Sequence, residues 1–579
     1  MNQPPPADTG PRVAETDATV GHAKRLTLVT LLSRLFGLLR DVLLAGWLGN
    51  SALQDRFVYA FIIPNLFRRL FGEGALSAAF VPTLTAVRAA DGPEAGVRLY
   101  QEVASLLAVC LVGVMLAVEL VLLGVYWWAD PGPGLRVAIG LTAVMLPFAP
   151  LICFAALMGS VLNVRGRFVG AAAMPILLSV VQIVVILWFA RWLIPGWGSD
   201  SGAGEAGRSG GRLGEVVVLA ASVVLAGLLQ VGMLGWLLHR AGFPLVWRWN
   251  PRSPGVRRML TMLLPAALGA GVLQLEPLID GQIILLLSSD GVSDKLVLGG
   301  YVLACPLAEG TQSSVAQAQR LYQFPLGVLA ISLATAVFPA LARQAAQQDR
   351  AGVAGELRRA LRLGLFEGIP AGVGLALLAV PITSLLFERG NFTAENTQAT
   401  AWVLRFYALG VPAFCCIHLL NRAFYALGDA RTPVRLAMWM VLVNVVGNLV
   451  LVFTPLGAGA FGLTAACSAT GLVLVSARKL SARLGEPLLS GAVAASALRT
   501  VVASGVMAAA VLGGVELAGL WTGGPDGSGG RFADRLLAAG LPMAAGVVSF
   551  GVCSWLLGAG ELKELVGRSR RASRRQAGL

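Results

Sequence analysis

Apolar runs of about 20 residues, each long enough to cross a bilayer as a helix, recur along this chain from residue 26 to residue 559. A helix of that length, rising ~1.5 Å per residue, spans the ~30 Å hydrocarbon core. Hydrophobic residues make up 56% of the 579 residues and charged residues only 13%, whereas soluble domains carry about 25% charge. We therefore expect a polytopic, all-α membrane protein and exclude a soluble globular one.

Charges, glycines and prolines divide the apolar runs into about 14 predicted transmembrane helices. Most of the 45 lysines and arginines fall in alternate loops, on the same side as the N-terminus. By the positive-inside rule, this bias places both termini in the cytoplasm. The basic tail at 560–579 follows the last span directly, so we interpret it as an orienting, lipid-facing segment rather than a nucleic-acid site.

Two pairs of similar segments, far apart in the chain, indicate an internal repeat. A-A-F-V-P-T-L-T at 78–85 resembles T-A-V-F-P-A-L-A at 335–342, and a second pair surrounds Pro147 and Pro412. An even number of predicted helices separates the copies, which predicts two halves related by a pseudo-two-fold axis along the membrane normal, around a central cavity. The predicted parts are a polar cytoplasmic tail at 1–25, six-helix halves at 26–240 and 241–480, two additional helices at 481–559 and the basic tail.

Several arginines lie inside the apolar spans, where a charge costs roughly 2.5–3.5 kcal/mol at the bilayer centre. They are Arg34, Arg40, Arg68, Arg69, Arg320, Arg405 and Arg422. We expect Arg405 and Arg422 to snorkel or to be paired, and the others to line a hydrated cavity, where Arg69 can pair with Glu73. Arginine suits phosphate because its planar fork donates two parallel hydrogen bonds. The pattern predicts an anion-binding cavity.

Other chemistries find little support in the sequence. The seven cysteines include no C-x-x-C pair, the three histidines are scattered, and no G-x-x-x-x-G-K-[ST] loop is present, so ATP hydrolysis is not expected. No loop is long enough for a catalytic domain, which favours a transporter over an enzyme. A drug or cation antiporter would need acidic cavity residues to bind its cationic substrates, whereas the spans of the first half carry arginines. A flippase for another lipid-linked saccharide shares the same physics and stays open.

Five motifs carry a resemblance to a known family. They are S-R-L-F-G-L-L-R-D at 33–41, P-N-L-F-R-R-L-F-G-E-G-A-L-S-A-A-F-V-P at 64–82, Q-R-L-Y-Q-F-P at 319–325, L-F-E-R-G-N-F-T at 386–393 and F-Y-A-L-G-D-A-R-T-P at 424–433. Over roughly residues 24–480 the sequence resembles the MurJ (MviN) lipid II flippases, within the multidrug/oligosaccharidyl-lipid/polysaccharide exporter superfamily.

The resemblance implies a protein of the bacterial inner membrane that moves lipid II, the undecaprenyl-pyrophosphate-linked peptidoglycan precursor, to the periplasmic leaflet by alternating access. Its partners would be lipid II, membrane lipids and cell-wall synthesis proteins, with no nucleic acid. The substrate-binding positions that it implies are Arg34, Arg40, Asp41, Asp55, Arg68, Glu73 and Arg320. The family often has Asp before the last of these arginines, where this chain has Gln319, and the outward loop at 289–310 is longer than the family's pattern.

Some members of the family also bind sodium, and no other cofactor is expected. The corresponding positions here are Asp280, Asn444, Asn448 and Thr464, with Glu276 as a substitute acid on the Asp280 face. Oxygen ligands of this kind suit a hard cation. The alternative is that Asn444 and Asn448 form hydrogen bonds between helices.

Overall fold

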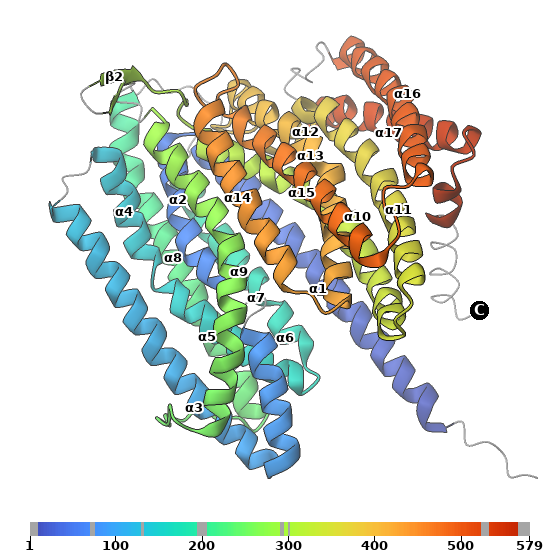
Figure 1. The fold of residues 1–579 in the computed structure, drawn as a ribbon. Helices are drawn as coiled ribbons and strands as arrows, with labels where there is room; N and C mark the ends of the chain where they lie inside the picture. The colour runs from blue at the N-terminus through green and yellow to red at the C-terminus, as the bar shows by residue number, and fades with distance from the viewer. Residues whose placement is uncertain are drawn as a thin grey trace, which may run out of the picture. The chain divides into compact units, whose positions relative to one another are not determined.

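The computed structural model describes seven stretches of the chain, and the fold is almost entirely helical (Figure 1). The stretches are residues 10–69, 76–128, 132–193, 205–289, 295–298, 301–522 and 532–565. This architecture confirms the all-α, polytopic class expected from the apolar runs.

The chain divides into two compact units. The first consists of Met1–Trp47 and Tyr59–Gln274, and the second of Leu48–Val58 and Leu275–Leu579. The helices of the first half of the chain are α1 (Gly10–Leu48), α2 (Ala52–Phe67), α3 (Leu76–Trp128), α4 (Pro133–Met145), α5 (Phe148–Val164), α6 (Phe168–Ala172), α7 (Met174–Leu193), α8 (Glu205–Arg240) and α9 (Pro254–Leu287). Helices α2 and α9 each contribute residues to both units.

The remaining helices belong to the second unit. They are α10 (Thr311–Ala346), α11 (Arg350–Leu377), α12 (Ala379–Phe387), α13 (Ala394–Ala426), α14 (Arg431–Leu451), α15 (Gly459–Leu484), α16 (Gly491–Thr522) and α17 (Phe532–Leu556). One of its core clusters is built from α10, α11, α13 and α15, with Leu333, Leu357, Leu419, Phe424 and Leu480 among its buried members.

Ten of the described helical stretches are long and apolar enough to cross a membrane, or 11 if the two arms of α10 count as one bent span. One of them, Ala79–Trp128, is 50 residues long and contains a break at Gly92, where the backbone leaves the helical region (φ 86°). A stretch of that length holds more than one bilayer crossing. The count of 14 is compatible with these spans and stays a prediction, as do the boundaries of the expected halves.

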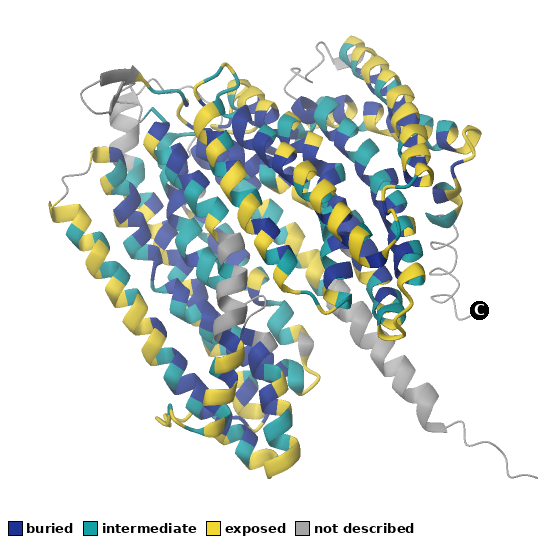
Figure 2. Ribbon diagram, in the orientation of Figure 1, coloured by how far each residue is buried: buried dark blue, intermediate teal, exposed yellow. Residues whose placement is uncertain are grey.

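Helix α14 shows why the fold belongs in lipid. Its outward residues are large and apolar, and Trp439, Val443 and Val450 are all exposed (Figure 2). Its buried residues include two amides, Asn444 and Asn448. This is the reverse of a helix in water, which hides its apolar stripe and exposes its polar one. A bilayer accepts such an inverted pattern because hydrocarbon solvates the outer face.

The connection between α9 and α10 contains the one sheet of the described residues, a pairing that the sequence analysis did not anticipate. Strands β1 (Lys295–Leu298) and β2 (Tyr301–Ala304) are antiparallel, with Leu298 opposite Tyr301. The two residues between the strands are glycines in the sequence. Gly-Gly between apolar segments is a known hairpin signal, so the longer loop noted at 289–310 could have been predicted as a hairpin.

Helices α13 and α15 pack closely enough that one contact position requires glycine. A Cβ added to Gly462 would lie 2.7 Å from the Tyr407 backbone nitrogen and 2.9 Å from the Val403 carbonyl oxygen. Both neighbours are backbone atoms, so no side-chain rotation can relieve the contact. Small residues of this kind allow membrane helices to approach and gain van der Waals contact.

We predict that Gly462→Ala forces α13 and α15 apart and lowers the free energy of unfolding by about 1–3 kcal/mol, the usual cost of overpacking. Thermal unfolding of the detergent-purified protein would measure the loss. Gly471→Ala is the matched control, because Gly471 lies on the same helix and an added Cβ there meets nothing within 4 Å. Equal melting temperatures for the two variants would contradict the close contact.

Candidate functional site

In the first unit, Arg40 forms a charged pair with its neighbour on α1. Its Nε donates to Asp41 Oδ1 at 2.9 Å and its Nη2 donates to the same oxygen at 2.6 Å. The third contact crosses to α7, where Arg40 Nη1 donates to Gln182 Oε1 at 3.2 Å. Gln182 is buried, so this network fixes the guanidinium on an apolar helix. Arg34, two turns earlier on α1, is exposed.

The other predicted arginine of this unit, Arg68, lies at the end of α2. Its Nε donates to Asn65 Oδ1 at 2.8 Å, one helical turn back, and the side chain is half-buried. Arg69 beside it is also half-buried. The expected partner of Arg69, Glu73, lies outside the described residues, so that pairing stays a prediction.

In the second unit, Arg320 lies on α10 with its side chain exposed. The preceding Gln319, which stands where the family often has Asp, donates from Nε2 to the Tyr407 hydroxyl on α13 at 3.0 Å. The amide therefore joins α10 to α13, where a carboxylate would have offered only acceptor oxygens.

Asp55 binds the N-terminus of the helix that carries Arg320. Asp55 Oδ2 accepts from the Gly310 backbone N–H at 2.9 Å, and Oδ1 accepts from the Ser313 N–H and hydroxyl at 2.8 and 2.6 Å. Gly310 supplies no side-chain cap of its own. Asp55 is buried, so its role in the structure is to cap and position α10.

The capping is reciprocal. Glu309 Oε1 accepts from the Ala52 N–H at the start of α2, at 2.6 Å, so each helix is capped by an acid from the other's segment. Gly310 between them has φ +82°, and a Cβ there would lie 2.4 Å from the Asn50 carbonyl oxygen. Asn50 also donates to Ser314 Oγ at 2.8 Å. These contacts fix residues 48–58 to the start of α10.

Four residues predicted for sodium come together in the second unit, from α9, α14 and α15. Asn448 Nδ2 donates to Asp280 Oδ1 at 2.8 Å, and Asn444 Nδ2 donates to Glu276 Oε1. With their nitrogens turned to the acids, both amides turn their oxygens to the Thr464 hydroxyl, at 2.9 Å for Asn444 and closer for Asn448. Asp280, Asn444 and Asn448 are buried.

The atoms of this cluster fit a cation. Thr464 Oγ1 also lies 2.9 Å from the Ala460 carbonyl oxygen and 3.3 Å from that of Phe461. A hydroxyl has one proton to donate, so four oxygens around it compete for a single hydrogen. The two acids add negative charge, and neither takes part in an ion pair recorded for the described residues. An excess of oxygen over donors is the composition that a hard cation completes.

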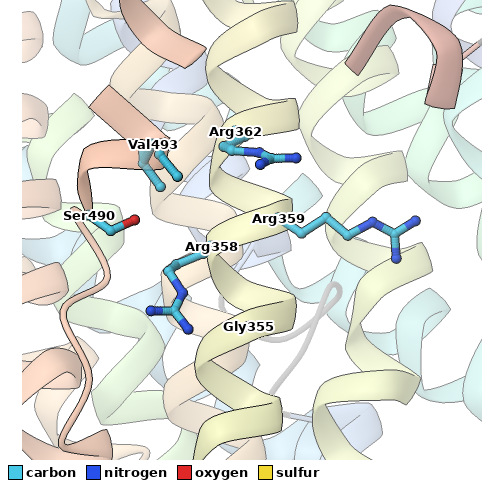
Figure 3. A pocket seen from close by; sticks show the side chains of 7 residues that line it. Gly355, Arg358, Arg359, Arg362, Ser490 and Val493 are labelled. Atoms are coloured by element: carbon cyan, nitrogen blue, oxygen red, sulfur yellow. The ribbon is translucent and has the colours of Figure 1, made fainter. Parts of the chain in front are cut away.

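A basic pocket of about 350 Å³ lies between α11 and the start of α16 (Figure 3). Its lining residues are Gly355, Arg358, Arg359, Arg362, Ser490, Ala492 and Val493. Each guanidinium is already paired: Arg358 with Glu486 at 3.1 Å, Arg359 with Glu564 at 2.7 Å and Arg362 with Glu561 at 3.1 Å.

These pairs explain the pocket without a ligand. Glu561 and Glu564 follow α17, and Glu486 precedes α16, so the arginines of α11 hold the ends of both C-terminal helices. At the other end of α17, Arg535 pairs with Glu388, which follows α12, at 3.1 Å. Charge pairs thus attach α17 near both of its ends, to α11 and to the residue after α12, and attach the start of α16 to α11.

The structure therefore brings together some predicted residues and places others apart. Arg40 and Asp41 are in contact, and the sodium candidates form one cluster with Glu276. Arg34 lies on α1 and Arg68 at the end of α2, and Arg320 lies on α10 in the second unit. Sequence reasoning missed Gln182, whose polar side chain inside an apolar helix was a signal, and it missed Glu309, whose acid directly precedes a helix start.

The fold and these polar groups define the chain as a polytopic membrane transporter. A model of the family described as "Lipid II flippase MurJ" matches residues 44–523. The "Probable lipid II flippase MurJ" of Rhizobium meliloti (strain 1021) is 33% identical over 444 residues, covering 76% of this chain and 75% of that protein. The "Lipid II flippase MurJ" of Burkholderia cenocepacia is 31% identical over 466 residues, covering 78% and 82%. The chain belongs to the MurJ family.

Solved structures agree on the fold. The chain is similar to "Lipid II flippase MurJ, inward closed conformation", with a TM-score of 0.68 and 20% identity over 93% of this chain and 99% of that one. It is also similar to an inward-facing multidrug resistance MATE family transporter, with a TM-score of 0.61 and 14% identity over 80% and 98%. At these identities the likeness concerns the fold alone.

We predict that Asp55→Asn lowers the free energy of unfolding by about 1–3 kcal/mol, because an amide replaces one of the two oxygens that cap α10. Thermal unfolding would measure the loss, and hydrogen exchange should accelerate over the first turns of α10. Asp91→Asn, at an exposed position, should change neither. Unaltered exchange at the start of α10 in the Asp55 variant would rule out the cap.

Proposed function

We propose that this protein is a lipid II flippase, which moves the undecaprenyl-pyrophosphate-linked precursor from the cytoplasmic to the periplasmic leaflet by alternating access. The observation that carries the proposal is the presence of Arg40, Arg68 and Arg320 on apolar helices of a chain that belongs to the MurJ family. The names of its relatives support lipid II as the substrate.

The physical problem in such transport is the head group. Pyrophosphate and sugars carry charge and many hydrogen-bonding groups, which hydrocarbon leaves unsatisfied at a cost of several kcal/mol each. Guanidinium groups in a hydrated cavity replace water as partners of the pyrophosphate, while the polyprenyl tail stays in the bilayer. Arg40 suits this role because its hydrogen bonds to Asp41 and Gln182 hold the guanidinium in a fixed position.

The fold alone does not choose the substrate, since multidrug transporters share it. The basic residues favour an anionic substrate over the cationic drugs of an antiporter. A different lipid-linked saccharide would bind through the same pyrophosphate contacts, and it is the second outcome of the test below. We propose a multi-pass location in the bacterial inner membrane with both termini cytoplasmic, from the distribution of basic loops.

We also propose that sodium binds the cluster of Glu276, Asp280, Asn444, Asn448 and Thr464. Support comes from five side-chain oxygens on three helices and from the shortage of donors around Thr464. Bound sodium would supply positive charge that balances the two acids. An ion gradient or the membrane potential would then drive transport.

The flippase proposal predicts that this chain restores growth and surface exposure of labelled lipid II in a bacterium depleted of its own flippase. Arg68→Ala and Arg320→Ala should abolish rescue, because the pyrophosphate loses its cationic partners. Arg405→Ala, in an apolar helix but assigned to no site, is the matched control. A well-expressed protein that fails to rescue would favour a different lipid-linked saccharide. Rescue by both variants would exclude binding of the pyrophosphate by Arg68 and Arg320.

The sodium proposal predicts that NaCl raises the melting temperature of the purified protein above its value in equal KCl, because a ligand of the native state stabilises it. Thr464→Val keeps the side-chain shape, removes the hydroxyl oxygen and should abolish the difference. Ser468→Ala, one turn along the same buried side of α15, should retain it. Identical melting curves in the two salts for the unaltered chain would exclude the site.

A further inference from the structure

One face of α10 combines charge, amide and aromatic ring. Arg320, Gln323 and Phe324 are three and four residues apart, so they share that face, and all three are exposed. At ~1.5 Å per residue, Phe324 lies about 20 Å along the helix from Thr311. A bilayer core is ~30 Å thick, which places this group well inside the membrane.

This face of α10 meets water rather than lipid. An arginine exposed to hydrocarbon would cost roughly 2.5–3.5 kcal/mol, and an exposed amide adds to that cost. In the second arm of α10, beyond its bend, Thr335 Oγ1 accepts from Arg422 Nη2 at 3.1 Å, and the Arg422 guanidinium lies 5.5 Å from the centre of the Phe338 ring. The polar groups continue along the helix, as on the wall of a hydrated cavity.

An exposed phenylalanine, Phe324, is unexpected on a helix face that meets water. Its exposure is 55%, although a large apolar ring in water is unfavourable by about 25 cal/mol per Å². The neighbouring aromatic residue, Tyr322, is instead packed in the bundle, with its ring centre 5.0 Å from that of Tyr407 and 5.3 Å from that of Phe414. Rings of this kind within a polar cavity are typical of ligand sites, where aromatic groups supply contact area and a few polar groups fix orientation.

We propose that Phe324 is the stacking platform for the sugar joined directly to the pyrophosphate, and that Gln323 hydrogen-bonds the polar groups of that sugar. This inference rests on the proposed function. Residues i and i+4 on a helix are about 5–6 Å apart, and a sugar attached to a phosphate oxygen lies at a similar distance from the phosphorus. A pyrophosphate on Arg320 therefore presents its first sugar to the Phe324 ring, whose flat face fits the C–H face of a pyranose.

The test compares two ligands that differ only in the saccharide and its peptide. Purified full-length protein is titrated with lipid II and with undecaprenyl pyrophosphate, and binding is followed by native mass spectrometry. The unaltered chain should bind lipid II more tightly. Phe324→Ala should weaken lipid II binding about fivefold to tenfold, the value of one aromatic contact, and leave undecaprenyl pyrophosphate unchanged.

Further variants separate stacking from packing. Phe324→Tyr keeps the ring and should bind both ligands as the unaltered chain does, whereas Phe324→Leu keeps only apolar volume and should resemble Phe324→Ala. Phe453→Ala removes a phenylalanine of similar exposure, 53%, and should have no effect. Arg320→Ala should weaken both ligands, because it removes the contact with the pyrophosphate that they share.

Three results would overturn the inference. They are an unchanged lipid II affinity in Phe324→Ala, an equal loss of affinity for both ligands in that variant, and an unaltered chain that binds lipid II no better than undecaprenyl pyrophosphate. In each case the stacking of the first sugar on Phe324 is excluded. A chain that binds and moves lipid II still supports the proposed function. Failure of the unaltered chain to bind lipid II at all would remove the proposed function and this inference together.

Discussion

Hydrocarbon offers no hydrogen-bond partner, and this constraint decides where every polar group of the chain lies. In helix α14, Asn444 and Asn448 are buried, whereas the valines on the opposite side are exposed, where lipid would solvate them. The guanidinium of Arg40 finds its partners on its own helix and on α7. Among the described residues, the Arg40 network and the cluster around Thr464 are polar groups of apolar helices at which function is proposed.

The same constraint applies to helix ends, whose backbone groups lack partners within the helix. Asp55 accepts a hydrogen bond at the start of α10, and Glu309 accepts one at the start of α2, although the two residues are far apart in sequence. Because α10 carries Arg320 and Phe324, the acid that caps it also sets their position. Asp55 thus influences the position of both side chains through the helix that it caps, and its predicted contact with substrate stays a prediction. A loss of transport in an Asp55 variant would report misplacement of α10.

Much of the fold follows from local sequence, whereas the site follows only in part. Apolar runs and basic loops predict helices and their class because each span is solvated by lipid separately. The cluster of Asp280, Asn448 and Thr464 was found through family resemblance, since no spacing along the chain brings three helices together. Arg34 and Asp41 are seven residues apart and share a helix face, yet the adjacent Arg40 makes the contact with Asp41. Gln182 and Glu309 carry a local signal, but the partners that they contact depend on tertiary packing, which the local pattern does not reveal.

The route of the chain through its two units has a mechanical consequence. Residues 48–58 group with the second unit although the residues on both sides of them group with the first, and the final crossing falls between Gln274 and Leu275. Two of these crossings lie well inside helices, in α2 and in α9, and the third falls at the last residue of α1. We therefore expect a displacement of one unit against the other to bend α2 and α9. Elastic bending of the connecting helices would then take the place of rotation about a flexible hinge loop.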